Sequence, residues 1–141
     1  MSNLRQAIFA AFGPQEPPSE WSSDLEPFLK DWEGRALIAA VSGRRWEELA
    51  DPEVMKGICS DAAVWVALLS TQWFRYYLPA LLVATANDKD PFTNNIRGLL
   101  HNLLSCRRNM SERDEERRRS VYQSLSPDQR NALEAYIKGL K

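Results

Sequence analysis

The feature that most constrains this chain is a stretch of residues that is apolar on nearly every side. Residues 71–86 read TQWFRYYLPALLVATA, and the larger segment 62–86 contains only one charged side chain, that of Arg75. A helix that is apolar all round is buried on most sides. We therefore predict that 71–86 is the central helix of a small core, kinked at Pro79, because proline removes the backbone hydrogen bond to the carbonyl of Arg75.

A membrane span is the alternative interpretation of the same stretch, and three features oppose it. Residues 70–72, Ser-Thr-Gln, form a helix-start signal that divides the apolar run, and the part after Pro79 is short. Arg75 would lie in the hydrocarbon at a cost of several kcal/mol. The chain begins MSNLRQAIFAAFG, which lacks the charged and long apolar regions of a secretory signal. We therefore expect a cytoplasmic protein without a membrane segment.

The rest of the chain shows helical spacing of apolar residues and no convincing period-two alternation. Capping boxes begin at Ser23 and Ser126, and Asp51 and Asp90 each precede a proline, as N-cap residues do. The Pro-rich segment 14–20 is expected to be an extended connector. The expected helices are 3–12, 25–41 with an optional break at Gly34, 52–58, 62–69, 71–86, 91–106 and 127–140. We predict an all-α fold, a compact single-domain bundle of six or seven helices spanning residues 1–141.

Two of these helices have apolar stripes that predict which side chains are buried. In the first, the stripe runs through Trp32 and continues across Gly34 to the alanines 36, 39 and 40. In the second, it comprises Phe92, Ile96, Leu99, Leu100, Leu103 and Leu104.

Three motifs in this chain resemble those of a known family. They are GRRWEEL at 43–49, YYLPA at 76–80 and LSPDQRNALEAYIKGL at 125–140. In this order they are similar to an uncharacterised family of small bacterial proteins with a Tyr-Tyr-Leu-Pro-Ala helix and a C-terminal Leu-Ser/Thr-x-x-Gln helix. The resemblance covers about residues 24–140 and implies no catalytic residue. By analogy, small proteins of this kind often accompany secreted toxins as immunity proteins.

Few residues suggest catalytic or cofactor chemistry. Cys59 and Cys106 are the only cysteines and have no metal-binding or redox spacing. The single histidine, His101, falls away from the apolar stripe of its helix and is expected at the surface. Asp88 and Asp90 flank Lys89 and are interpreted as a turn with an N-cap, although a carboxylate-only magnesium site is left open. With no glycine-rich phosphate loop or GxSxG motif, we expect no catalytic, cofactor or metal site.

The charge pattern bears on the partners. Eighteen basic and nineteen acidic residues give a net charge of −1, which argues against a general nucleic-acid binder. Residues 107–119 carry ten charges and are interpreted as a solvated loop or helix arm with i,i+4 ion pairs. The alternative is a docking surface that includes Arg117–Arg119.

These observations lead to three hypotheses. The first is a non-enzymatic interaction module, most concretely a bacterial immunity protein that neutralises a cognate toxin. Its predicted partner contacts are Glu47, Glu48, Asp88 and Asp90, or alternatively the mixed arm 112–119 with Glu112, Asp114, Glu115 and Glu116. The second is a small enzyme or ligand-binding domain with a pocket near the Pro79 kink, lined by Arg75, Tyr76, Tyr77 and His101. The third is a structural or regulatory subunit of another assembly.

Overall fold

The fold is built from helices joined by short connections. A computed structural model of the chain describes residues 2–13, 30, 32–67, 74–86, 90–105 and 109–138, and within these ranges no strand occurs. The α-helices are α1 (Ser2–Phe12), α3 (Trp32–Val41), α4 (Pro52–Ile58), α5 (Ala62–Ala67), α6 (Phe74–Thr85), α7 (Pro91–Leu104), α8 (Glu112–Ser124) and α9 (Pro127–Lys138), and a 3-10 turn, η1 (Trp46–Leu49), precedes α4. The predicted all-α bundle is confirmed. The predicted connector 14–20 and the capping box at Ser23 lie outside the described residues.

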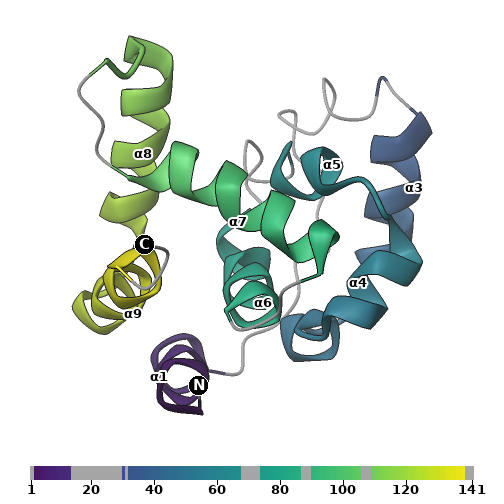
Figure 1. Ribbon diagram of the computed structural model, residues 1–141, viewed down its shortest axis with the longest axis horizontal. Coiled ribbons are helices and arrows are strands. Elements are labelled where there is room, and N and C mark those ends of the chain that lie inside the picture. Colours follow the sequence, from purple (N-terminus) through teal and green to yellow (C-terminus); the bar gives the residue numbers. More distant parts are fainter. Residues whose placement is uncertain are drawn as a thin grey trace.

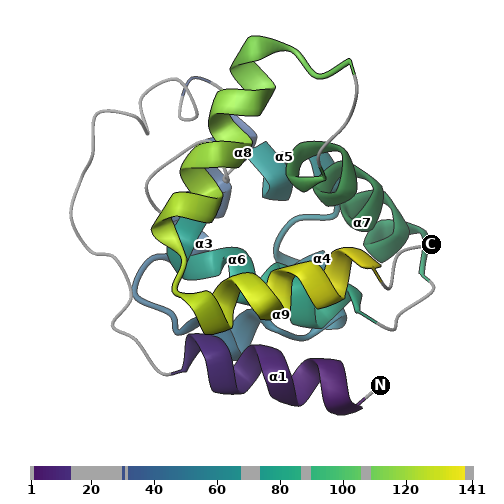
Figure 2. The ribbon, with the colours of Figure 1, turned by 90° about the vertical axis from the view of Figure 1, so that its left-hand side faces the viewer.

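Helix α6 is the centre of the bundle, as the apolar stretch predicts. Every residue from Tyr76 to Thr85 is buried, and the helix contacts η1, α1 and α7 (Figure 1). Pro79 lies inside it. Helix α1 runs alongside α9 at the edge of the bundle, below α6 in both views (Figure 2). Among the described residues, none of the helices combines the length and the apolarity that crossing a bilayer requires.

Local cap signals place several helix ends where the sequence predicts them. The Asp51 carboxylate accepts a hydrogen bond from the Glu53 amide at 2.9 Å. Ser126 and Gln129 form a reciprocal capping box, with bonds of 3.0 and 3.2 Å. Gly13 ends α1 with φ +58°, a left-handed conformation that glycine adopts without steric cost. Asp90 occupies the N-cap position of α7, but its carboxylate pairs with Lys56 at 3.3 Å instead of capping the helix.

Two adjacent tyrosines join α6 to the loop between α3 and η1. The Tyr76 hydroxyl accepts a hydrogen bond from the Trp46 amide at 3.0 Å, and the Tyr77 hydroxyl donates to the Val41 carbonyl at 2.8 Å. Gly43, with φ +76°, allows the turn between these two points. The backbone of the loop is therefore hydrogen-bonded to two side chains of the central helix.

Trp46 continues this connection toward α1. Its ring nitrogen donates to the Gly13 carbonyl at 3.0 Å, and its ring centroid lies 4.9 Å from that of Phe9. Two side chains of α1, Ile8 and Phe12, are buried. The tryptophan thus joins α1 to the same loop that the tyrosines hold.

The predicted stripe of α3 is wrong. Trp32 is 70% exposed, the alanines 36 and 39 are exposed and the alanine at 40 is half-buried, whereas Gly34, Leu37 and Val41 are buried. The helix runs through Gly34 without a break, and the face bearing Leu37 and Val41 turns inward because these side chains bury more apolar area than alanines do. In α7 the predicted stripe is buried except for Leu99, which is 37% exposed.

A buried hydrogen bond connects α6 to α9. The hydroxyls of Thr85 and Tyr136 lie 2.5 Å apart, and Thr85 also donates to the Leu81 carbonyl at 2.7 Å. Burial raises the pKa of Tyr136 to about 12, although the bond to Thr85 acts in the opposite direction. Burial, with a smaller contribution from Tyr76, raises the pKa of Tyr77 above its ordinary value too. Both phenols are therefore held neutral by the fold.

Truncation of Leu78 tests the central position of α6. Leu78 is fully buried, so Leu78→Ala should lower the free energy of unfolding by about 2–5 kcal/mol. Chemical denaturation measures this change, and Gln123→Ala on the exposed surface of α8 serves as a control that should stay within about 0.5 kcal/mol of wild type. An unchanged stability of Leu78→Ala would contradict the central placement of the helix.

The buried phenols predict a loss of stability at alkaline pH. An unfolded tyrosine ionises near pH 10, below the folded value of Tyr136, so above pH 10 the unfolded state binds fewer protons than the folded state. The contribution of Tyr136 to the free energy of unfolding should therefore be constant below about pH 10 and fall as the pH rises toward 12. Denaturant titrations over this pH range measure the slope. Tyr136→Phe should have a shallower slope than wild type, and equal slopes would refute the assignment.

Candidate functional site

The sequence-predicted contact residues do not form one surface. Glu48 lies in η1, and Asp90 is paired with Lys56 of α4 at the start of α7, whereas the acidic residues of α8 lie at the opposite side of the molecule from α4 (Figure 1). Glu48 accepts from the Arg45 amide at 3.1 Å and pairs with Arg44 at 3.5 Å. Asp88 is outside the described residues. The two alternative groups of predicted contacts therefore lie in separate regions of the molecule.

Glu47 differs from its neighbours because part of its carboxylate is enclosed. The residue is half-buried, and its Oε1 atom is the one buried side-chain oxygen or nitrogen in the described part of the chain without a hydrogen-bond partner. The side chain as a whole still reaches the surface, so Glu47 does not define a site.

Helix α8 neutralises much of its own charge. Ser111 caps its start by accepting from the Asp114 amide at 3.1 Å. Glu115 pairs with Arg118 at 3.6 Å and with Arg119 at 3.5 Å, and Arg118 also donates to the Leu104 carbonyl at 3.2 Å. The predicted helix arm with internal ion pairs is thus observed, while Glu112 and Glu116 remain exposed on it. The side chain of Arg117 is not among those that the structure describes.

The residues predicted to line a pocket at Pro79 do not converge on one. Tyr76 and Tyr77 are 7% and 1% exposed, and their hydroxyls are bound to the backbone of the 41–46 loop. His101 is exposed on α7, with its Nδ1 atom 3.0 Å from the Ser105 hydroxyl. The side chain of Arg75 lies outside the described residues. The two tyrosines therefore have a structural role.

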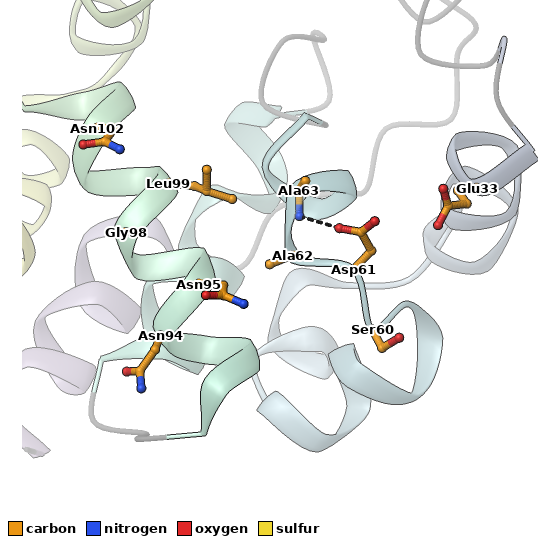
Figure 3. Close-up of a pocket in the computed structure, with 10 residues that line it drawn as sticks. All are labelled: Glu33, Ser60, Asp61, Ala62, Ala63, Asn94, Asn95, Gly98, Leu99 and Asn102. Atoms are coloured by element: carbon orange, nitrogen blue, oxygen red, sulfur yellow. Dashed lines mark hydrogen bonds between the residues drawn. The ribbon is translucent and has the colours of Figure 1, made fainter.

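A groove instead lies along the outer side of α7 (Figure 3). It is open to solvent, has a volume of about 810 Å³, and is bounded by α7, by the segment that leads into α5, and by the first turn of α3. The described residues that line it are Glu33, Ser60, Asp61, Ala62, Ala63, Asn94, Asn95, Gly98, Leu99 and Asn102. Three segments distant in sequence meet here.

The α7 wall consists of asparagines, a glycine and a leucine. Asn95, Gly98, Leu99 and Asn102 occupy one face of the helix because they are spaced by three, four and seven residues, and all four are exposed. In Figure 3, Asn95 and Leu99 project from α7 toward the segment that carries Ala62 and Asp61. The opposite face of α7 carries Phe92, Ile96, Leu100 and Leu103, which are buried. The helix thus presents a core face and a distinct groove face.

The facing wall is acidic. Asp61 accepts a hydrogen bond from the Ala63 amide at 2.9 Å, which caps α5 and fixes its carboxylate at the groove. Glu33 lies in the first turn of α3. The pKa of the nearby Cys59 thiol is raised, mainly by burial and also by the negative charges of Asp61 and Glu33. The described lining residues include these two carboxylates and no lysine or arginine.

The surroundings of the groove limit its chemistry. Arg97 stands next to it and donates to the Asn94 side chain. In the part of the chain that the structure describes, no three histidine, cysteine or carboxylate side chains come together as metal ligands would. The groove therefore offers amide groups, two carboxylates and an exposed leucine.

Sequence reasoning missed the α7 wall, although one signal could have found it. Asparagine and glycine are poor helix formers and cost about 0.6–1 kcal/mol each relative to alanine in a helix interior. The segment PFTNNIRGLLHNLL places such residues at four positions of one helix. Their concentration on a single exposed face indicates a surface that is not optimised for stability.

Comparison with known proteins gives a family but no activity. Residues 29–141 match the model of a family described as a family of unknown function (DUF6714). This match covers every helix from α3 to α9 and leaves α1 outside. No curated protein and no solved structure shows significant similarity to the chain.

Gly98 provides a test of the groove face in the free protein. Its φ is not in the left-handed region, and an added Cβ would meet no atom within 4 Å. Gly98→Ala should therefore raise the free energy of unfolding by about 0.5–1 kcal/mol, because alanine favours the helix. Denaturation curves measure the shift. A destabilised variant would show that the fold itself requires the glycine.

Proposed function

The chain belongs to this family of unknown function, and we propose that it is a non-enzymatic, cytoplasmic protein-interaction module that binds a protein partner through the groove on α7. The observation that carries the proposal is the groove face itself. Asn95, Gly98, Leu99 and Asn102 lie exposed at the centre of a helix whose other face is fully used by the core. Asn95, Gly98 and Asn102 neither pack the core nor favour the helix, and such residues fit a role outside the chain.

The shape of the groove favours a macromolecular partner. Small-ligand sites enclose most of the ligand surface and are predominantly apolar. This groove is open, and amides and carboxylates make up much of its lining. A protein segment can cover such a surface while its remaining contacts lie outside the groove.

The charge of the groove favours a protein over a nucleic acid. Asp61 and Glu33 would repel phosphate groups, which bind to arginine and lysine in nucleic-acid complexes. Two arginines of α8, Arg118 and Arg119, are paired with Glu115 and are therefore less available to phosphate groups. The acidic wall is complementary to a cationic protein surface.

For the partner, we propose a toxin domain, so that the chain acts as a bacterial immunity protein. Its small size, its helical core and the acidic groove wall formed by Asp61 and Glu33 support this role. The exposed Glu112 and Glu116 of α8 would then extend the contact beyond the groove. Binding alone, without catalysis, would block the toxin.

Co-expression with the neighbouring gene of the host tests this proposal. If that gene encodes the toxin, its induction should arrest growth, the present chain should restore growth, and the two products should co-purify as a complex. A neighbouring product that is neither toxic nor bound would exclude the immunity role. An affinity purification from the native host that returns no protein above an untagged control would exclude the interaction module as a whole.

A further inference from the structure

Nothing in the described part of the chain explains the glycine at position 98. It lies near the middle of the fourteen-residue α7, where glycine costs about 1 kcal/mol relative to alanine. Neither its backbone conformation nor its neighbours require the absence of a side chain. At an exposed helical position, the missing Cβ has one remaining physical effect, which is that another backbone can approach α7 more closely.

The residues around Gly98 suit such an approach. Leu99 lies beside it as an exposed apolar contact, and Asn95 and Asn102 stand on either side along the helix. They are seven residues apart, which is about 10.5 Å along the axis. Each asparagine amide has donors and an acceptor and can therefore bond to either polar group of a peptide backbone.

The opposite wall of the groove favours an occupant with a positive charge. Asp61 is fixed by its cap to Ala63, and Glu33 lies on the same side of the groove (Figure 3). The described lining residues supply no cation to balance these two carboxylates. A lysine or arginine of the occupant would meet these two carboxylates at a solvent-exposed position, where added salt weakens an ion pair.

We propose that the occupant of the groove is a segment of a protein partner whose backbone crosses α7 at Gly98 and whose lysine or arginine side chain pairs with Asp61 and Glu33. This inference rests on the proposed function, because it specifies the chemistry of the partner at the same site. The amides of Asn95 and Asn102 bind the backbone of the segment, and Leu99 contacts an apolar side chain next to its cation.

The test uses a displayed library of random peptides as the probe and the full chain as the target. Peptides selected on the wild-type protein should be enriched in lysine or arginine next to an apolar or small residue. Their affinity should fall with added salt, since exposed ion pairs are screened. Selection of no peptide above background, or of peptides without this enrichment, would overturn the inference.

Three variants in the groove, compared with two controls outside it, then locate the binding of the selected peptides. Asp61→Asn removes the charge but keeps an N-cap acceptor, and Glu33→Gln removes the second charge. Each should weaken binding about tenfold, the equivalent of one lost charge-assisted contact. Gly98→Ala should weaken binding by a similar factor although it stabilises the free protein. Gly57→Ala is its matched control, because Gly57 is also exposed in a helix with no atom within 4 Å of an added Cβ but lies outside the groove.

Gly57→Ala and the exposed Glu134→Gln of α9 should bind the peptides as wild type does. Equal affinities for wild type and Gly98→Ala, or for wild type and Asp61→Asn, would overturn the inference. The proposed function can fail independently. If a toxin binds the Gly98 and Asp61 variants as tightly as wild type, the protein is an interaction module but the partner does not bind in this groove. If peptides with the expected pattern are selected but no host partner is found, the groove chemistry is supported and the proposed function is refuted.

Discussion

Two hydrogen bonds, one at Tyr76 and one at Tyr77, hold the 41–46 loop against the central helix α6. A loop that crosses the central helix has backbone groups that burial would leave unsatisfied, at a cost of about 1–3 kcal/mol each. The Tyr76 hydroxyl satisfies the Trp46 amide and the Tyr77 hydroxyl satisfies the Val41 carbonyl. With the loop fixed, the Trp46 ring reaches Phe9 and the Gly13 carbonyl. Helix α1, which lies outside the family match, is thereby attached to the family domain.

The sequence could predict the elements whose determinants are local. The caps at Asp51 and Ser126 depend on neighbouring residues, and the buried helix α6 depends on its own composition, so both were predicted correctly. The orientation of α3 depends on which face meets the rest of the core. A stripe extended from Trp32 therefore gave the wrong face, and the inward side is that of Leu37 and Val41. The hydroxyl partners of the tyrosines, thirty or more residues away, carry no local signal.

The groove is harder to predict from the sequence than the helices are, because it exists only where three segments meet. Glu33, Asp61 and the 94–102 face of α7 are brought together by the packing of α3 and α7 around α5. The acidic residues chosen from the sequence were those in charge-rich runs, and three of them, Glu48, Asp90 and Glu115, are paired with nearby arginines or lysines. Asp61 lies outside those runs, and its local role is to cap α5. Its second property, a fixed charge facing a groove, follows from the fold.

The two faces of α7 have different roles. The buried face contributes to stability, and the groove face is exposed and available to a partner. The asparagines and the glycine of the groove face forfeit roughly 2–3 kcal/mol of helix propensity relative to alanine, a substantial part of the 5–15 kcal/mol by which domains are stable. The buried face of α7 and the fully enclosed α6 offset this loss. The Tyr-Tyr-Leu-Pro-Ala motif lies in that enclosed helix, so it identifies the fold and says little about the partner. Under the proposed function, the partner is recognised by the exposed residues Asn95, Gly98, Leu99 and Asn102 of α7.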